Sequence, residues 1–96
     1  MKLQIVSGLS GSGKTIALQV LEDLDYYCID NLPLELLSEL VDKSLKDRLY
    51  IDKIAVGIDA RTLGSNFSGF AEILKTIEEI NIECHVLFLH AQTKIL

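Results

Sequence analysis

The sequence has little cysteine, little proline and no long hydrophobic segment. Its two cysteines, Cys28 and Cys84, do not form a metal-spaced pair, and we expect both to be reduced core residues. No apolar run approaches the ~18 residues that a membrane-spanning helix needs. The N-terminus has no apolar core with a cleavage pattern, so we expect no signal peptide. These absences predict a cytoplasmic protein with no membrane segment.

Positive charge is also scarce. Nine Lys and Arg residues against fourteen Asp and Glu residues give a net charge of -5, and Arg48 and Arg61 are the only arginines. This balance argues against a general nucleic-acid-binding surface. The 96 residues are 49% hydrophobic and 24% charged, which is typical of one globular domain. They contain no internal repeat, linker or low-complexity segment.

Glycine, in contrast, is concentrated near the N-terminus. The pattern G-x-x-x-x-G-K-[ST] of phosphate-binding loops is matched by Gly8-Leu9-Ser10-Gly11-Ser12-Gly13-Lys14-Thr15. Glycines let the backbone approach phosphates closely, so that its N–H groups surround the phosphate oxygens. We expect Lys14 to reach the β- and γ-phosphates and the Thr15 hydroxyl to bind Mg²⁺. The alternative is a Gly/Ser-rich turn that only joins a strand to a helix.

Hydrophobic patterning predicts alternating strands and helices. We expect strands over 2–6, 26–29, 51–58 and 82–89, and helices beginning near Gly13 and Pro33 and over 70–77. Asn31 is a plausible cap before the second helix, and 61–69 is expected to be a polar loop. This order predicts an α/β fold, a P-loop NTPase-like three-layer sandwich with a mostly parallel sheet.

The chain stops just after the last expected strand, whereas P-loop domains usually run longer. We therefore expect residues 1–96 to be the N-terminal part of a truncated P-loop nucleotide-binding domain, with the C-terminal remainder absent. A sheet edge left uncovered by this truncation makes a homo-oligomer plausible.

Acidic residues end two of the expected strands. The apolar strand 54–58 followed by Asp59 matches a Walker-B-type element, whose carboxylate holds Mg²⁺; capping of the next turn is the alternative. Arg61 either contacts phosphate or a base, or is a solvated loop cation. Asp30 ends the second strand, where it either positions a water or an acceptor hydroxyl or caps the following helix. His90 is expected to be a loop residue.

The phosphate loop, followed by Tyr27-Cys28-Ile29-Asp30-Asn31-Leu32-Pro33, strongly resembles the RapZ/YvcJ family of P-loop nucleotide-binding proteins. Asp59-Ala60-Arg61 resembles the D-x-R segment of that family, and Leu87-Phe88-Leu89 resembles its strand before an acidic residue. The resemblance covers essentially the whole chain and about the first third of a family member.

The resemblance implies a cytoplasmic bacterial protein that binds ATP and GTP with Mg²⁺, with slow NTPase activity in some members. It implies an ATP site at Gly8 through Thr15 and a segment assigned to GTP at Asp59, Ala60, Arg61 and Thr62. With the motifs, it makes Lys14 and Asp59 the candidate catalytic residues and Thr15 and Asp59 the candidate metal ligands. The adaptor role of some members in small-RNA decay belongs to a C-terminal domain and is not carried over.

Three residues depart from the family pattern. Asp25 stands where Gly is usual, Ala60 where Val is usual, and His90 where Asp is usual. The first predicts some loss of stability at a helix exit, and the last puts hydrolysis in doubt. The alternative function is a small-molecule or nucleotide kinase that uses the same loop for phosphoryl transfer. A kinase usually needs a lid that carries arginines, and this sequence has only two arginines and no visible lid, so the regulatory nucleotide-binding protein is favoured. A third alternative is a folded fragment without activity.

Overall fold

Four parallel strands form the centre of the molecule. The computed structural model describes residues 2–8, 13–46, 52–80 and 82–89, and within them the strand order is β2-β3-β1-β4. The strands are β1 (Lys2–Gly8), β2 (Tyr27–Ile29), β3 (Lys53–Asp59) and β4 (Glu83–Leu89). The register of β1 on β3 runs from Lys2 opposite Lys53 to Gly8 opposite Asp59. The prediction of an α/β fold with a parallel sheet is confirmed.

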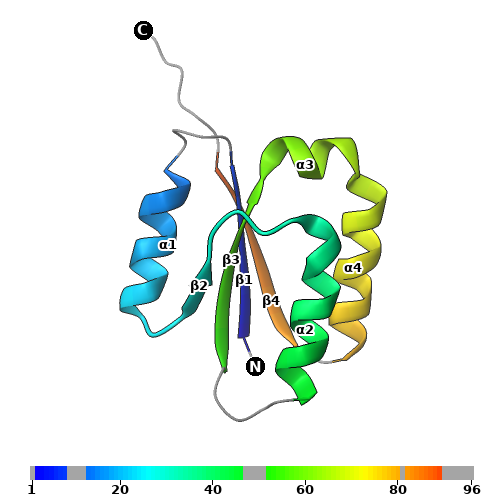
Figure 1. Ribbon diagram of the computed structural model, residues 1–96, viewed down its shortest axis with the longest axis horizontal. Helices are drawn as coiled ribbons and strands as arrows, with labels where there is room; N and C mark the ends of the chain where they lie inside the picture. The colour runs from blue at the N-terminus through cyan, green and yellow to red at the C-terminus, as the bar shows by residue number, and fades with distance from the viewer. Residues whose placement is uncertain (1, 9–12, 47–51, 81, 90–96) are drawn as a thin grey trace, which may run out of the picture.

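Helices cover both faces of this sheet. In the described ranges they are α1 (Lys14–Asp23), α2 (Leu37–Lys46), α3 (Ala60–Ser65) and α4 (Phe67–Glu79), and a short 3-10 helix, η1 (Leu34–Leu36), precedes α2. The chain crosses from β1 to β2 in one direction and from β2 through β3 to β4 in the other. Because parallel crossovers are right-handed, α1 lies on one face and α2, α3 and α4 lie on the other (Figure 1). The three-layer, P-loop NTPase-like arrangement is therefore confirmed.

The larger hydrophobic core lies between the sheet and the layer of α2 and α4. Leu3 and Ile5 of β1 point into it and are completely buried, together with Phe70 of α4. A smaller core on the opposite face contains Val6 of β1 and Leu18 of α1. Residues 54–58 of β3 are buried throughout, as expected of a parallel strand covered on both faces.

The prediction of a polar loop over 61–69 is wrong. Residues 60–65 form α3, and α4 begins at Phe67. Capping explains the difference: Asp59 Oδ1 accepts a hydrogen bond of 2.8 Å from Arg61 N, and Asn66 Oδ1 accepts one of 3.3 Å from Gly69 N. The two caps allow α3 to form and α4 to begin at Phe67, ahead of the predicted helix over 70–77, in a polar stretch where hydrophobic periodicity indicates no helix.

Among the residues that the structure describes, two other than glycine have a positive φ, Asp25 at 71° and Asn31 at 60°. The prediction of Asn31 as a helix cap is also wrong, because η1 begins after Pro33 with no side-chain capping bond. Instead, Asn31 makes the turn that leads the chain away from β2. In the described part of the chain, no helix is long and apolar enough to cross a membrane.

Candidate functional site

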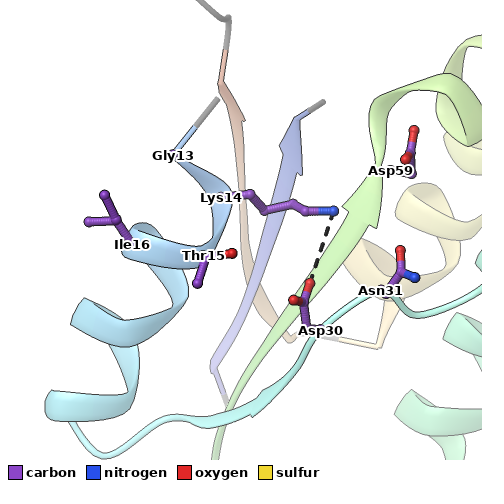
Figure 2. Close-up of a pocket in the computed structure, with 7 residues that line it drawn as sticks. All are labelled: Gly13, Lys14, Thr15, Ile16, Asp30, Asn31 and Asp59. Atoms are coloured by element: carbon purple, nitrogen blue, oxygen red, sulfur yellow. Dashed lines mark ion pairs between the residues drawn. The ribbon is translucent and has the colours of Figure 1, made fainter. Parts of the chain in front are cut away.

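A pocket of about 570 Å³ opens at the carboxyl ends of the strands. The connections that leave the neighbouring strands β1 and β3 turn to opposite faces of the sheet, and α/β proteins bind ligands in the crevice that such a reversal creates. Its lining among the described residues consists of Gly13, Lys14, Thr15, Ile16, Asp30, Asn31 and Asp59 (Figure 2).

The first turn of α1 forms one wall of the pocket. Gly13, the residue before the helix, has a φ of 96°, which L side chains rarely adopt, and its carbonyl accepts a 2.9 Å hydrogen bond from Ala17 N. Backbone N–H groups in a first helical turn lack helical partners and carry the positive end of the helix dipole. The first turn of α1 contains no acidic residue. This wall therefore suits an anion.

Lys14 extends from this turn across the pocket. Its side chain is only 13% exposed, and Nζ lies 4.0 Å from Asp30 Oδ1 (Figure 2). Because 57% of the Asp30 side chain is exposed, such a pair contributes about 0–1 kcal/mol to stability. The ion pair thus orients the ammonium group without binding it so strongly that an anionic ligand could not take it.

A glycine in β3 makes room for Asp30. A Cβ atom at Gly57 would lie 2.8 Å from Asp30 Oδ1 and 3.1 Å from Leu18 Cδ1. The backbone after Asp30 is attached to the same strand, because Leu32 N donates a 2.8 Å hydrogen bond to Gly57 O. Gly57 was not among the predicted site residues. A lone glycine inside an apolar strand is a signal of close approach by another segment, and this signal could have found it.

Asp59 reaches the pocket from the end of β3, next to Gly8 of β1. Its Oδ1 accepts the 2.8 Å bond from Arg61 N and lies 3.4 Å from Arg61 Nε. The backbone N–H of Arg61, and then its guanidinium, hold the pKa of the Asp59 carboxyl below its ordinary value. Asp59 is therefore ionised at neutral pH. Asp59 caps α3, which was one of the two roles considered for it. It also lines the pocket, and its role as a Mg²⁺ ligand stays a prediction.

The structure brings together only part of the predicted site. Gly13, Lys14, Thr15 and Asp59 share the pocket. Ala60, Arg61 and Thr62 lie in α3 and are not among the described lining residues, and the Arg61 side chain is 79% exposed. Leu9, Ser10, Gly11, Ser12 and His90 lie outside the described residues.

The pocket offers hard oxygen donors of the kind that Mg²⁺ prefers, namely the Thr15 hydroxyl and the carboxylates of Asp30 and Asp59. Within the described ranges, no three His, Cys, Asp or Glu residues cluster closely enough to hold a metal ion. This donor set fits a Mg²⁺ ion that takes one or two carboxylates and completes its coordination with phosphate oxygens and water.

The two cysteines take no part in the pocket lining. Both are free thiols and partly buried, as predicted. Cys28 Sγ donates to Leu18 O over 3.2 Å, and burial raises the pKa of both thiols, with the charge of Glu22 adding to the effect at Cys28. Raised pKa values make these thiols poor nucleophiles and poor metal ligands at neutral pH.

Comparison with known proteins identifies the family. A sequence model of the RapZ-like N-terminal domain matches residues 1–96. The chain belongs to the RapZ-like family. Relatives named nucleotide-binding proteins include one from Methylococcus capsulatus, 48% identical over 97 residues, and one from Pseudomonas fluorescens, 52% identical over 97 residues. Another, from Nitrosococcus oceani, is 50% identical over 91 residues, or 95% of this chain.

The first two alignments cover 100% of this RapZ-like chain. They cover 33% and 34% of the relatives, and the third covers 32%. The chain thus spans about one third of the length of the curated relatives that it matches.

Proposed function

We propose that the chain binds the Mg²⁺ complexes of ATP and GTP through a Walker A phosphate loop and hydrolyses them slowly. The observation that carries this proposal is the convergence of Lys14, Thr15 and Asp59 on one pocket at the start of α1. The names of the relatives, which describe nucleotide-binding proteins, support it. A regulatory role for the complete protein agrees with slow hydrolysis.

Four residues of the pocket, Gly13, Lys14, Thr15 and Asp59, have roles that their positions support. The backbone N–H groups around Gly13 and the Lys14 ammonium would hold phosphate oxygens. From the sequence motif, we expect residues 9–12 to bind phosphate as well. Thr15 and Asp59 would hold Mg²⁺, which supplies charge neutralisation at the phosphates when bound. The segment from Asp59 to Thr62, implied by the family resemblance, would add contacts specific to GTP.

Slow turnover follows from the arginine content of the site. An arginine positioned on the transferred phosphoryl group contributes ~10³–10⁵ in rate. Arg61, the one arginine within the described residues, is mostly exposed and is engaged with Asp59. A kinase would need such groups as well as an acceptor pocket, and this comparison favours the nucleotide-binding protein over the kinase alternative.

The test is a calorimetric titration of the purified protein with ATP and GTP in Mg²⁺. Lys14→Ala should weaken binding by about 10- to 100-fold, since a hydrogen bond to a charged group contributes ~1.5–3 kcal/mol. The matched control is Lys75→Ala, which removes an exposed lysine of α4 outside the pocket lining. Affinity that Lys14→Ala leaves unchanged would refute the proposed site. Accumulation of a phosphorylated acceptor instead of free phosphate would favour the kinase.

A further inference from the structure

The pocket carries an acidic residue that the proposed function does not use. Among the described lining residues, Lys14 contributes one positive charge, and Asp30 and Asp59 contribute one negative charge each, which leaves a net charge of -1. A nucleoside triphosphate brings several more negative charges to this place. Asp59 has a partner in Arg61, whereas the one charged partner of Asp30 in the described structure is Lys14, the cation on which the phosphates depend.

Asp30 is close enough to affect any ligand of Lys14. Its Oδ1 lies 4.0 Å from Lys14 Nζ. A charge-assisted contact between Nζ and a phosphate oxygen has a length of ~2.8 Å, so this oxygen lies within about 7 Å of Asp30 Oδ1 in the described geometry. The Debye length at physiological salt is about 8 Å, so salt only partly screens the repulsion between the two anionic groups.

The fold keeps Asp30 in this place. The bond from Leu32 N to Gly57 O attaches the chain to β3 two residues after Asp30, and Asn31 between them has a left-handed backbone. The absent side chain of Gly57 leaves the space in which the carboxylate lies. A strand-end aspartate that only faced solvent would need neither feature.

We propose that Asp30 selects the metal-bound form of the nucleotide. Its carboxylate repels a metal-free triphosphate at Lys14, and this repulsion is weaker when Mg²⁺ accompanies the phosphates and neutralises part of their charge. Asp30 is thus a specificity-determining residue, and Gly57 is the positioning residue that admits it. This inference rests on the proposed nucleotide binding at the same pocket.

The experiment measures ATP affinity by calorimetry with excess Mg²⁺ and with a chelator in place of Mg²⁺. The quantity compared is the ratio of the two dissociation constants. Asp30→Asn should tighten metal-free binding by about tenfold, because it removes a like charge about 7 Å from a phosphate oxygen, and the Coulomb repulsion at that distance is of this order near a protein surface. The affinity with Mg²⁺ should change much less, so the dissociation constant without Mg²⁺ divided by that with Mg²⁺ should fall about tenfold. Asp30→Glu restores the charge and should return the ratio toward that of the parent protein.

Two further variants separate local charge from net charge and from folding. Asp23→Asn removes the same charge from an exposed position at the end of α1 and should leave the ratio unchanged. Gly57→Ala keeps every charge but places a methyl group where Asp30 Oδ1 lies. It should lower the ratio, as Asp30→Asn does.

The outcomes distinguish this inference from the proposed function. If the parent protein binds ATP in neither condition, the proposed function fails and the inference fails with it. If the parent protein binds MgATP but Asp30→Asn leaves the ratio unchanged, or shifts both constants equally, the inference alone is overturned. If Asp23→Asn lowers the ratio as much as Asp30→Asn does, the inference is also overturned, since net charge would then account for the effect.

Discussion

Replacing Asp25 by glycine should stabilise the protein. Asp25 follows the last turn of α1 with a φ of 71°, and its N–H donates to Glu22 O over 3.0 Å. Tyr26 N donates to Leu21 O over the same distance, which completes the two hydrogen bonds of a Schellman motif. Glycine is the preferred residue at this position, because the left-handed conformation costs other residues ~1–2 kcal/mol.

The expected gain is smaller than that cost for two reasons. Aspartate tolerates the left-handed region better than most residues, and glycine loses ~0.4–1 kcal/mol through the greater freedom of the unfolded chain. A net stabilisation of about 0.5–1 kcal/mol remains, which corresponds to about 2–8 °C in Tm for a domain of this size. Differential scanning calorimetry measures the shift directly.

Asp25→Ala is the matched control, because it removes the same carboxylate from the same exposed position. Any effect of the lost charge on the helix dipole is shared by the two variants, so their difference reports the backbone alone. We expect the glycine variant to melt above the alanine variant. Equal melting temperatures for the two variants would refute the assignment of strain to this turn.

The remaining predictions concern the metal and the acidic residues. Thr15→Ala should raise the Mg²⁺ concentration for half-maximal ATP binding about tenfold, the order of one lost bond to a charged group; an unaltered metal titration contradicts the ligand role. Asp59→Asn should reduce hydrolysis about 10- to 100-fold and binding less, and equal losses would indicate a structural aspartate. Because the pKa of Asp59 is lowered in the folded protein, its stabilisation is present above the ordinary carboxyl pKa and disappears as pH falls through the lower value. In urea unfolding below about pH 4, the free energy of unfolding of Asp59→Asn should therefore fall less steeply with decreasing pH than that of the parent protein.

Local patterns explain why much of the fold could be predicted. The apolar run at 54–58 indicates a strand buried on both faces, and a glycine-rich motif between a strand and a helix indicates where the sheet meets α1. Parallel strands bring their carboxyl ends to one edge, so the sequence predicts that Asp30 and Asp59 share one crevice, and the structure finds both in one pocket with Lys14. These inferences need only sequence-local information and one topological rule.

The parts that were wrong or missed depend on other information. The helices α3 and α4 are initiated by side-chain caps at Asp59 and Asn66, and a polar composition hides such a start. The missing Arg61 contact with the pocket has the same origin, because capping turns the chain into α3 immediately after Asp59. The lone glycine in an apolar strand signals a close approach at Gly57, but no local pattern identifies Asp30, which follows β2, as the residue that approaches it.

Gly57 connects the packing of the fold with the chemistry of the pocket. Asp30 Oδ1 and Leu18 Cδ1 both lie close to the position that a Cβ atom at residue 57 would take, and Leu18 belongs to the buried face of α1. Leu18 lies four residues after Lys14, one helical turn along α1, so the distance between this helix and β3 also sets how far Lys14 extends over the strand ends. A larger residue at 57 would therefore displace the Asp30 carboxylate directly and press on α1 through Leu18. The separation of Lys14 and Asp30 is thus a consequence of core packing, and the charge balance of the pocket follows from the same contact.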